Sequence, residues 1–176
     1  MAAREKDAAE RYEEASAAYG AALERLARAY EADPDRRRDL LQEIHIALWR
    51  SLAGFDGRCS LRTWVYRVAH NTATSQVIRR RTNAPTLVSL DEVEAMPADD
   101  NGHLEADQQR DMQQILTLVR TLAPLDRQVI LLYLEGMDAA AIGDVTGLSS
   151  GNVATKVHRI KKILGQRFHE GGRGGR

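Results

Sequence analysis

The stretch AAAIGDVTGLSSGNVATKVHR, residues 139–159, decides the fold of the C-terminal part of the chain. Gly143 is small enough for two helices to cross closely, and four residues later Gly147 permits the positive φ of a sharp turn. Six residues beyond that turn, Val153 returns to the core. This spacing predicts a helix-turn-helix, although a plain helical hairpin within a bundle shows the same pattern.

The second helix of this motif carries a polar outer face. The side chains that we expect there and that suit DNA are Ser150, Asn152, Thr155, Lys156 and Arg159. Hydroxyl, amide and cationic groups bind base edges and phosphates, and a major groove is wide enough for one helix. The motif therefore favours duplex DNA as a ligand.

The rest of the 176-residue chain shows helical periodicity, and strand patterns are nearly absent. We expect an all-α protein of two small helical domains, residues 10–81 and 109–168. An acidic flexible linker, residues 82–108, joins them, because this segment holds two prolines, a glycine and many acids but little helical pattern. A disordered tail, residues 169–176, follows the second domain.

Apolar residues at helical spacing mark the buried face of each predicted helix. Asp33 and Pro34 begin one helix, Ser60 caps the next, and Ser149 or Ser150 caps the last. The stripes expected in the core are Leu23, Leu26 and Tyr30 in residues 10–30; Leu41, Ile44, Leu48 and Leu52 in residues 34–52; Leu61, Val65, Val68 and Thr72 in residues 60–81; and Val153, Val157, Ile160 and Leu164 in the last helix.

The formal net charge is zero, from 25 basic and 25 acidic residues, but the charges are segregated. Residues 57–90 carry +6 from six arginines and no acid, residues 91–111 carry −7 from eight acids and one arginine, and residues 145–169 carry +5 without an acid. Two basic blocks separated by an acidic one are typical of two polyanion-binding surfaces joined by a spacer. Merely solvated helix faces remain the alternative.

A polar face is expected on the helix of residues 34–52, opposite its apolar stripe. The side chains on this face and at its edge are Asp39, Gln42, Glu43, Ile46 and Trp49. An acidic surface edged by apolar groups suits a partner helix that is rich in arginine. A face that is only solvated is the commoner explanation of such a pattern.

The run FDGRCSLRTWVYRVAHN, residues 55–71, combines a glycine-flanked loop with a helix of interleaved aromatic and basic residues. Unpaired bases need rings to stack on and cations for their phosphates. The run therefore favours single-stranded nucleic acid, although Trp64 and Tyr66 could instead be core residues of a three-helix domain.

Two segments together resemble the sigma-70 family of bacterial transcription factors, and specifically its extracytoplasmic-function (ECF) group. The segment DLLQEIHIALWRSLAGFDGRCSLRTWVYRVAHNTATSQVIRRR, residues 39–81, is similar to the domain that binds core polymerase and melts promoters. The segment ILTLVRTLAPLDRQVILLYLEGMDAAAIGDVTGLSSGNVATKVHRIKKIL, residues 115–164, is similar to the C-terminal helix-turn-helix domain. The resemblance covers about residues 16–81 and 108–168.

The resemblance implies three binding surfaces and a function. Core RNA polymerase is expected on Asp39, Gln42, Glu43, Ile46 and Trp49. The melted −10 strand is expected on Phe55, Arg58, Ser60, Arg62, Trp64, Arg67, His70 and Asn71. Duplex −35 DNA is expected on Ser150, Asn152, Thr155, Lys156 and Arg159. The implied function is promoter recognition, DNA melting and transcription initiation under the control of an anti-sigma factor.

Some positions depart from the pattern of the family. Gly143 stands where alanine is usual, which costs about 0.5–1 kcal/mol of helix stability. His70 stands where arginine is frequent, Ala154 where a basic residue is common, and Cys59 where serine is usual. Gly143 and Ala154 put the affinity of the second domain for DNA in doubt, but not its fold.

No catalytic residue, cofactor or metal site is expected, because the histidines show no metal-ligand spacing and no phosphate loop is present. The N-terminus lacks the apolar segment of a secretory signal, and no stretch is long enough for a membrane span, so we expect a cytoplasmic protein without membrane contact. Two alternatives stay open. One is a regulator that binds DNA without polymerase, and the other is a sigma-like protein that only titrates an anti-sigma factor.

The acidic linker suggests a hypothesis about the free protein. Its charge would attract both basic surfaces, each contact being weak and screened by salt. The sequence therefore predicts a partly compact, autoinhibited form that opens on polymerase.

Overall fold

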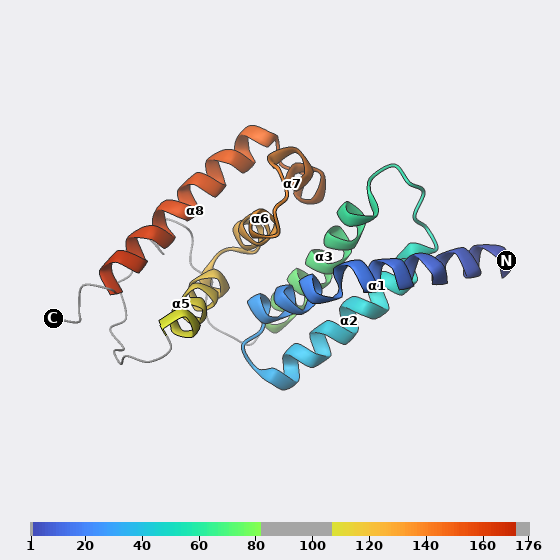
Figure 1. Cartoon of the computed structure of the whole chain (residues 1–176), viewed down its shortest axis with the longest axis horizontal. Coiled ribbons are helices and arrows are strands. Elements are labelled where there is room, and N and C mark those ends of the chain that lie inside the picture. The colour runs from blue at the N-terminus through green and yellow to red at the C-terminus, as the bar shows by residue number, and fades with distance from the viewer. Residues whose placement is uncertain (1, 82–106, 172–176) are drawn as a thin grey trace.

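The computed structural model describes residues 2–81 and 107–171, and every element within them is a helix (Figure 1). The helices are α1 (Ala2–Tyr30), α2 (Pro34–Leu52), α3 (Leu61–Arg81), α5 (Asp107–Thr121), α6 (Pro124–Leu134), α7 (Ala139–Thr146) and α8 (Ser150–Gly171). The predicted all-α fold is confirmed. Residues 82–106, which make up most of the predicted linker, and residues 172–176 of the predicted tail lie outside the described residues.

Side-chain caps fix where four of the helices begin. Asp33, Ser60, Asp138 and Ser149 each accept a hydrogen bond from the backbone N–H three residues later, at 2.8–3.3 Å. Each such cap contributes about 0.5–2 kcal/mol, because these N–H groups have no partner within the helix. The caps predicted at Asp33 and Ser60 are confirmed, and the last helix is capped by Ser149.

Three helices extend beyond the bounds that the sequence predicted. The first helix begins at Ala2 and not at residue 10, because alanine, glutamate and arginine dominate the start of the chain and favour helix. Asp107, which we assigned to the linker, already belongs to α5. At the other end, α8 continues to Gly171 and so includes the first residues of the predicted tail.

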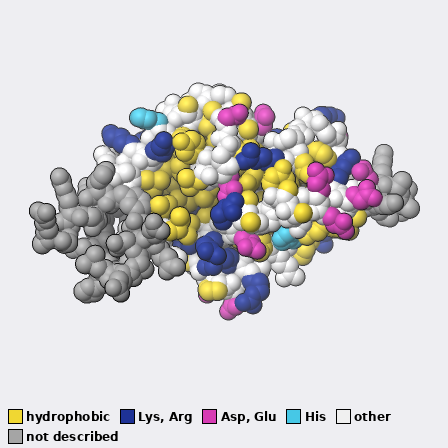
Figure 2. Space-filling view, viewed as in Figure 1, with side chains coloured by type: hydrophobic (Ala, Val, Ile, Leu, Met, Phe, Trp, Pro, Cys, Tyr) yellow, Lys and Arg dark blue, Asp and Glu magenta, His cyan; other side chains and the backbone are white. Residues whose placement is uncertain are grey.

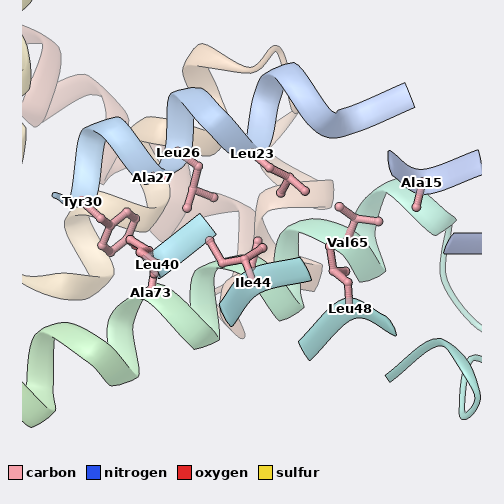
Figure 3. Packing of buried hydrophobic residues seen from close by; sticks show 11 residues of the cluster. Ala15, Leu23, Leu26, Ala27, Tyr30, Leu40, Ile44, Leu48, Val65 and Ala73 are labelled. Atoms are coloured by element: carbon pink, nitrogen blue, oxygen red, sulfur yellow. The ribbon is translucent and has the colours of Figure 1, made fainter. Parts of the chain in front are cut away.

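The first three helices enclose one apolar core (Figure 3). The buried residues of this cluster are Ala15, Leu23, Leu26, Ala27 and Tyr30 of α1, Leu40, Ile44 and Leu48 of α2, and Val65, Ala69 and Ala73 of α3. Leu40 is buried where Leu41 was expected, and Leu41, Leu61 and Val68 pack only partly against the cluster. The predicted stripe of α2 was therefore one residue out of phase at its first position.

The last four helices form a second group, with two clusters of buried residues. One cluster joins Val119 and Leu122 of α5 to Ile130 of α6 and to Ile160 and Ile163 of α8. Ile163 is buried there, whereas the predicted Leu164 packs only partly against the cluster.

The two groups of helices are packed against each other. The other cluster of the second group contains Val129, Leu132, Met137, Ile142, Val153 and Val157, together with Ala22 of α1 and Tyr66 of α3. Residues from both predicted domains therefore share one apolar cluster. This shared cluster positions α6 and α7 over the outer side of α1 and α3 (Figure 1).

A buried arginine closes the carbonyl end of α5 at this junction. Arg127 of α6 is 2% exposed and donates hydrogen bonds to the carbonyl oxygens of Val119 (3.1 Å), Leu122 (3.2 Å) and Arg120. Its guanidinium also lies over the ring of Tyr30, 5.1 Å from the centroid. The last carbonyls of a helix lack intrahelical partners, so Arg127 satisfies them while it contacts α1.

The helix-turn-helix has the predicted backbone. Gly147 ends α7 with φ 79°, the left-handed conformation that glycine adopts without strain. At Gly143, an added Cβ would lie 2.6 Å from the carbonyl oxygen of Leu148. The close approach of α7 to the turn therefore requires glycine at this position.

We expect Gly143→Ala to destabilise the fold by about 1–2 kcal/mol, a fall in Tm of several degrees. A backbone carbonyl cannot yield cheaply, so this crowding outweighs the helix propensity that alanine gains. Gly151→Ala is the control, because nothing lies within 4 Å of a Cβ at that exposed position of α8. Thermal unfolding should rank Gly151→Ala at or above the wild type, and an equal rise with Gly143→Ala would contradict the clash.

Candidate functional site

The polar face of α2 lies in solvent. All five residues assigned to it, Asp39, Gln42, Glu43, Ile46 and Trp49, are exposed. Ile46 keeps 42% and Trp49 keeps 49% of its surface accessible, which is high for apolar side chains of this size. The structure thus brings these five residues together on one accessible surface, with acidic and amide groups beside two apolar ones.

Figure 2 shows one charged face of the whole molecule. Basic and acidic side chains are intermixed over it, and acidic ones are most crowded toward the end where α1 begins.

Aromatic contacts organise the loop between α2 and α3. Phe55 and Trp64 meet edge to face, with ring centroids 5.3 Å apart. Trp64 Nε1 donates a hydrogen bond to Ser51 Oγ at 3.0 Å, and the indole is half-buried. Trp64 is therefore a packing residue of the loop that stays accessible in part, and a role in binding bases stays a prediction.

The arginines of α3 that we expected on DNA contact the second group of helices instead. Arg62 donates a hydrogen bond to the carbonyl oxygen of Glu135, and Arg67 donates one to that of Asp144, both at 2.5 Å. Arg58 in the loop forms an ion pair with Asp56 (2.8 Å). In this conformation, the Arg62 and Arg67 part of the predicted −10 surface faces α6 and α7.

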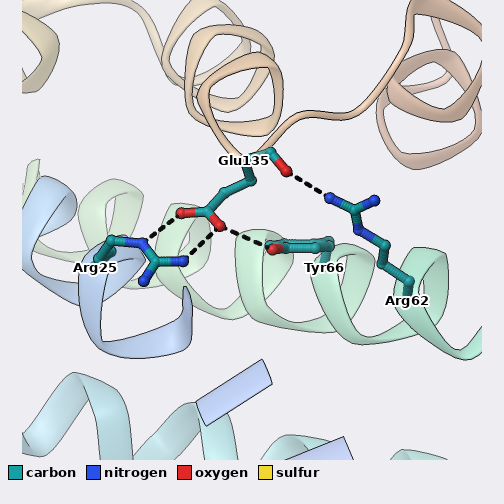
Figure 4. Close-up of polar contacts among 4 residues, drawn as sticks. All are labelled: Arg25, Arg62, Tyr66 and Glu135. Carbon is teal, nitrogen blue, oxygen red and sulfur yellow. Dashed lines mark hydrogen bonds and ion pairs between the residues drawn. The ribbon is translucent and has the colours of Figure 1, made fainter. Parts of the chain in front are cut away.

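A cluster of four residues, Arg25, Arg62, Tyr66 and Glu135, holds this contact together (Figure 4). Both carboxylate oxygens of Glu135 accept hydrogen bonds from Arg25, at 2.8 and 2.7 Å. The Tyr66 hydroxyl donates to the same carboxylate at 3.2 Å. The bond from Arg25 lowers the pKa of Glu135, and burial together with Glu135 raises the pKa of Tyr66 to about 12. Sequence analysis missed Arg25 and Glu135, because 110 positions separate them and neither belongs to a motif.

A cavity of about 730 Å³ lies between the loop and α7. Four residues of the predicted −10 surface line it, namely Arg58, Ser60, Trp64 and Arg67, and α7 forms the other side. Cys59 also lines it and is half-buried with a free thiol. The structure thus brings these four residues together, whereas Asn71 lies exposed farther along α3.

His70 does not lie on this surface. Its side chain is 1% exposed and its Nδ1 lies 3.0 Å from the Tyr30 hydroxyl. Burial lowers the pKa of His70 to about 3, so the ring is neutral at physiological pH. A DNA contact at His70 is therefore contradicted by its burial in this conformation.

The neutral His70 predicts a loss of stability in mild acid. Its pKa is depressed on folding, so below the unfolded value of 6.5 only the unfolded chain takes up the proton. Between pH 7 and pH 5.5 this one group should remove about 1 kcal/mol of unfolding free energy. Urea unfolding of wild type and His70→Gln at both values tests this, since the substitution should reduce the pH dependence by that amount. An unchanged pH dependence would contradict it.

The outer face of α8 is partly committed to contacts within the protein. Ser150, Asn152 and Thr155 are exposed as expected. Lys156, however, forms an ion pair with the buried Asp126 of α6 at 2.5 Å. Arg159 is half-buried. Three of the five predicted −35 residues are therefore freely accessible, and Lys156 must leave Asp126 or share it to reach a phosphate.

The described residues contain neither a membrane-spanning helix nor a cluster of metal-binding side chains. None of the helices described is long and apolar enough to cross a membrane. Likewise, no group of three or more His, Cys, Asp or Glu side chains within the described ranges could hold a metal ion.

The sequence matches two family models in the order that the resemblance predicts. Residues 16–83 match Sigma-70 region 2, and residues 112–164 match Sigma-70, region 4. The first match covers α2, α3 and the second half of α1, and the second covers α6, α7 and most of α5 and α8.

Individual proteins are also similar to this chain in sequence or in fold. The ECF RNA polymerase sigma factor SigG of Mycobacterium tuberculosis is 47% identical over 49 residues, which are 27% of this chain and 13% of SigG. The ECF RNA polymerase sigma-E factor of Escherichia coli K12 is 24% identical over 135 residues, 72% of this chain and 70% of that protein. CnrH, solved in complex with the cytosolic domain of CnrY, has a similar fold, with a TM-score of 0.66, 19% identity and coverage of 96% of this chain and 98% of CnrH.

Proposed function

Because this chain belongs to the ECF group of the sigma-70 family, we propose that it is a sigma factor, which binds core RNA polymerase and directs promoter recognition, melting and initiation. The observation that carries the proposal is the helix-turn-helix, whose second helix presents Ser150, Asn152 and Thr155 to solvent. A helix with such an exposed polar face fits the major groove. The factor contributes binding, and the polymerase carries out the chemistry.

Each of the three surfaces binds a different ligand. The exposed face of α2 around Asp39 and Glu43 binds polymerase. The loop of residues 55–60 and α3 through Asn71 hold the melted −10 strand, and α8 reads the −35 duplex. Acidic groups beside exposed apolar ones suit a basic partner helix, whereas rings and arginines together suit unpaired bases. His70 is excluded from this assignment because it is buried.

Promoter binding requires a more open form than the one described. Arg62 and Arg67 donate hydrogen bonds to backbone carbonyls of the second group of helices, so α6 and α7 lie against the surface on which a DNA strand would have to bind. We propose that docking on polymerase separates α6 and α7 from α3. The sequence predicted that the acidic linker holds the free protein closed, but most of that linker lies outside the described residues. The cluster of Arg25, Arg62, Tyr66 and Glu135 provides a separate cause of the closed form.

An anti-sigma factor is the proposed regulator. CnrH, whose fold resembles this one, was solved with the cytosolic domain of CnrY. By analogy, we propose that a protein partner covers the polymerase-binding or DNA-binding surfaces of this chain until a signal removes it.

Run-off transcription with purified core polymerase on fragmented genomic DNA tests the function directly. The proposal predicts discrete transcripts that require both the factor and core polymerase. Tight, specific binding of duplex DNA by the protein alone, without any such transcripts, would favour the independent regulator. A protein that neither binds DNA nor supports transcription, yet captures an anti-sigma factor, would favour the titrating protein.

A further inference from the structure

The first half of α1 contacts both functional surfaces of the N-terminal domain, although it begins before residue 16, where the family match starts. Arg11 and Tyr12 are adjacent on this part of the helix and point to different neighbours. Tyr12 packs edge to face on Trp49 of the proposed polymerase surface, with ring centroids 5.3 Å apart, and its hydroxyl lies 2.9 Å from Nδ1 of His45. Arg11 reaches the loop.

Arg11 holds Phe55 by two different interactions. It donates a hydrogen bond to the carbonyl oxygen of Phe55 at 3.0 Å, and its guanidinium lies over the Phe55 ring, 5.3 Å from the centroid. Asp7, one turn earlier on α1, forms an ion pair with Arg11 at 3.0 Å. The guanidinium is thus oriented from its own helix and fixes both the backbone and the side chain of Phe55.

Phe55 in turn meets Trp64 edge to face, so contacts run without a break from Arg11 through Phe55 to Trp64. These contacts fix Phe55, from which the loop leads to Arg58 and Ser60. Just beyond Phe55, residues 56–58 of the loop are exposed, and Arg58 forms an ion pair with its neighbour Asp56.

We propose that Arg11 is a positioning residue for the promoter-strand surface: it sets the place of Phe55, and through it the loop that grips the melted −10 strand. This inference rests on the proposed function. Arg11 need not contact the DNA itself, because its guanidinium is directed at Phe55. A rigid loop loses less conformational freedom when it binds a strand, so this contact raises affinity without adding a contact to DNA.

A spectroscopic experiment on the full-length free protein tests the positioning alone. The chain has only two phenylalanines, Phe55 and Phe168, so fluorophenylalanine labelling gives two ¹⁹F signals, which Phe168→Leu assigns. Arg11→Ala should shift and broaden the Phe55 signal while the Phe168 signal and the helicity stay unchanged. Arg28→Ala, which removes an equal charge from an exposed position of α1, should move neither signal. An unmoved Phe55 signal in Arg11→Ala would overturn the proposal.

A functional experiment uses the holoenzyme on a promoter whose −10 region is unpaired. Wild-type holoenzyme must first bind this template in preference to unrelated DNA. If it does not, the result contradicts the proposed function rather than the role of Arg11. Arg11→Ala should weaken binding about threefold to tenfold, since one hydrogen bond and one cation–π contact are lost. Arg11→Lys should restore part of it, and Arg28→Ala should bind as wild type. Equal losses of affinity in Arg11→Ala and Arg28→Ala would mean that Arg11 acts only through its charge, and they would overturn the proposal.

Discussion

Reversing the charge of Asp39 and Glu43 together, as Asp39→Arg with Glu43→Arg, is expected to abolish association with core RNA polymerase. Both carboxylates are exposed and lie one turn apart on the polar face of α2, beside Ile46 and Trp49. Two ion pairs with a basic partner helix would become two repulsions, and like charges across an interface cost several kcal/mol. We therefore expect affinity to fall by at least about a hundredfold.

Co-purification of the double variant with core polymerase is the measurement, and circular dichroism checks that its helicity is intact. Glu13→Arg combined with Glu24→Arg is the matched control, because both acids are exposed on α1 and the change in net charge is the same. The control should co-purify as wild type does. If the variant at Asp39 and Glu43 also co-purified undiminished, the α2 face would not be the polymerase surface.

Glu135→Arg is expected to open the free protein. The substitution removes the two hydrogen bonds from Arg25 and the one from Tyr66, and it places a new cation against Arg25 and Arg62. Arg25 is 60% exposed, so its ion pair counts for little more than a surface pair. With the repulsion and the loss of a partner for the buried Tyr66, the closed form should lose about 2–3 kcal/mol, which shifts the equilibrium roughly 30-fold to 150-fold.

Small-angle scattering should report a larger radius of gyration for Glu135→Arg, and duplex promoter DNA should bind it more tightly than it binds wild type. Glu24→Arg controls for charge, because Glu24 is exposed on α1. Acid should act in the same direction: the pKa of Glu135 is lowered on closing, so the contribution of this carboxylate is complete above its ordinary value of 4.5 and is lost as the pH falls below it. An unchanged radius of gyration in Glu135→Arg would mean that contacts other than those of Glu135 hold the closed form.

Local signals in the sequence were enough for the helices and the helix-turn-helix. Caps such as Asp33 and Ser60 and the turn glycine Gly147 act within a few residues, so their effects can be predicted from neighbours alone. Helical periodicity has a resolution of about one residue where apolar residues are adjacent, which is why Leu41 was expected in the place of Leu40. The exposure of the five residues of the α2 face could also be predicted, because they lie on the side of the helix opposite its buried stripe.

The long-range contacts could not be predicted in the same way. The sequence around His70 does not indicate that Tyr30 lies beside it. His70 was therefore expected to contact DNA, because it belongs to a basic helix, whereas it is buried next to Tyr30. The same holds for Glu135 and Arg11, whose partners are far away in the chain and come within reach only after the helices have packed. Gly143 shows a milder case: its close approach was expected, but the Leu148 carbonyl that enforces it was not.

The apolar cluster that both groups of helices share makes the closed form sensitive to temperature. Opening would bring Ala22 and Tyr66 into water, together with the surfaces of the α6, α7 and α8 residues that share their cluster. Exposure of such surface has a positive heat-capacity change, and the hydrophobic attraction weakens on cooling. The free protein should therefore open more readily in the cold. Under the proposed function, a chilled cell would then need less polymerase to draw the same fraction of it into transcription.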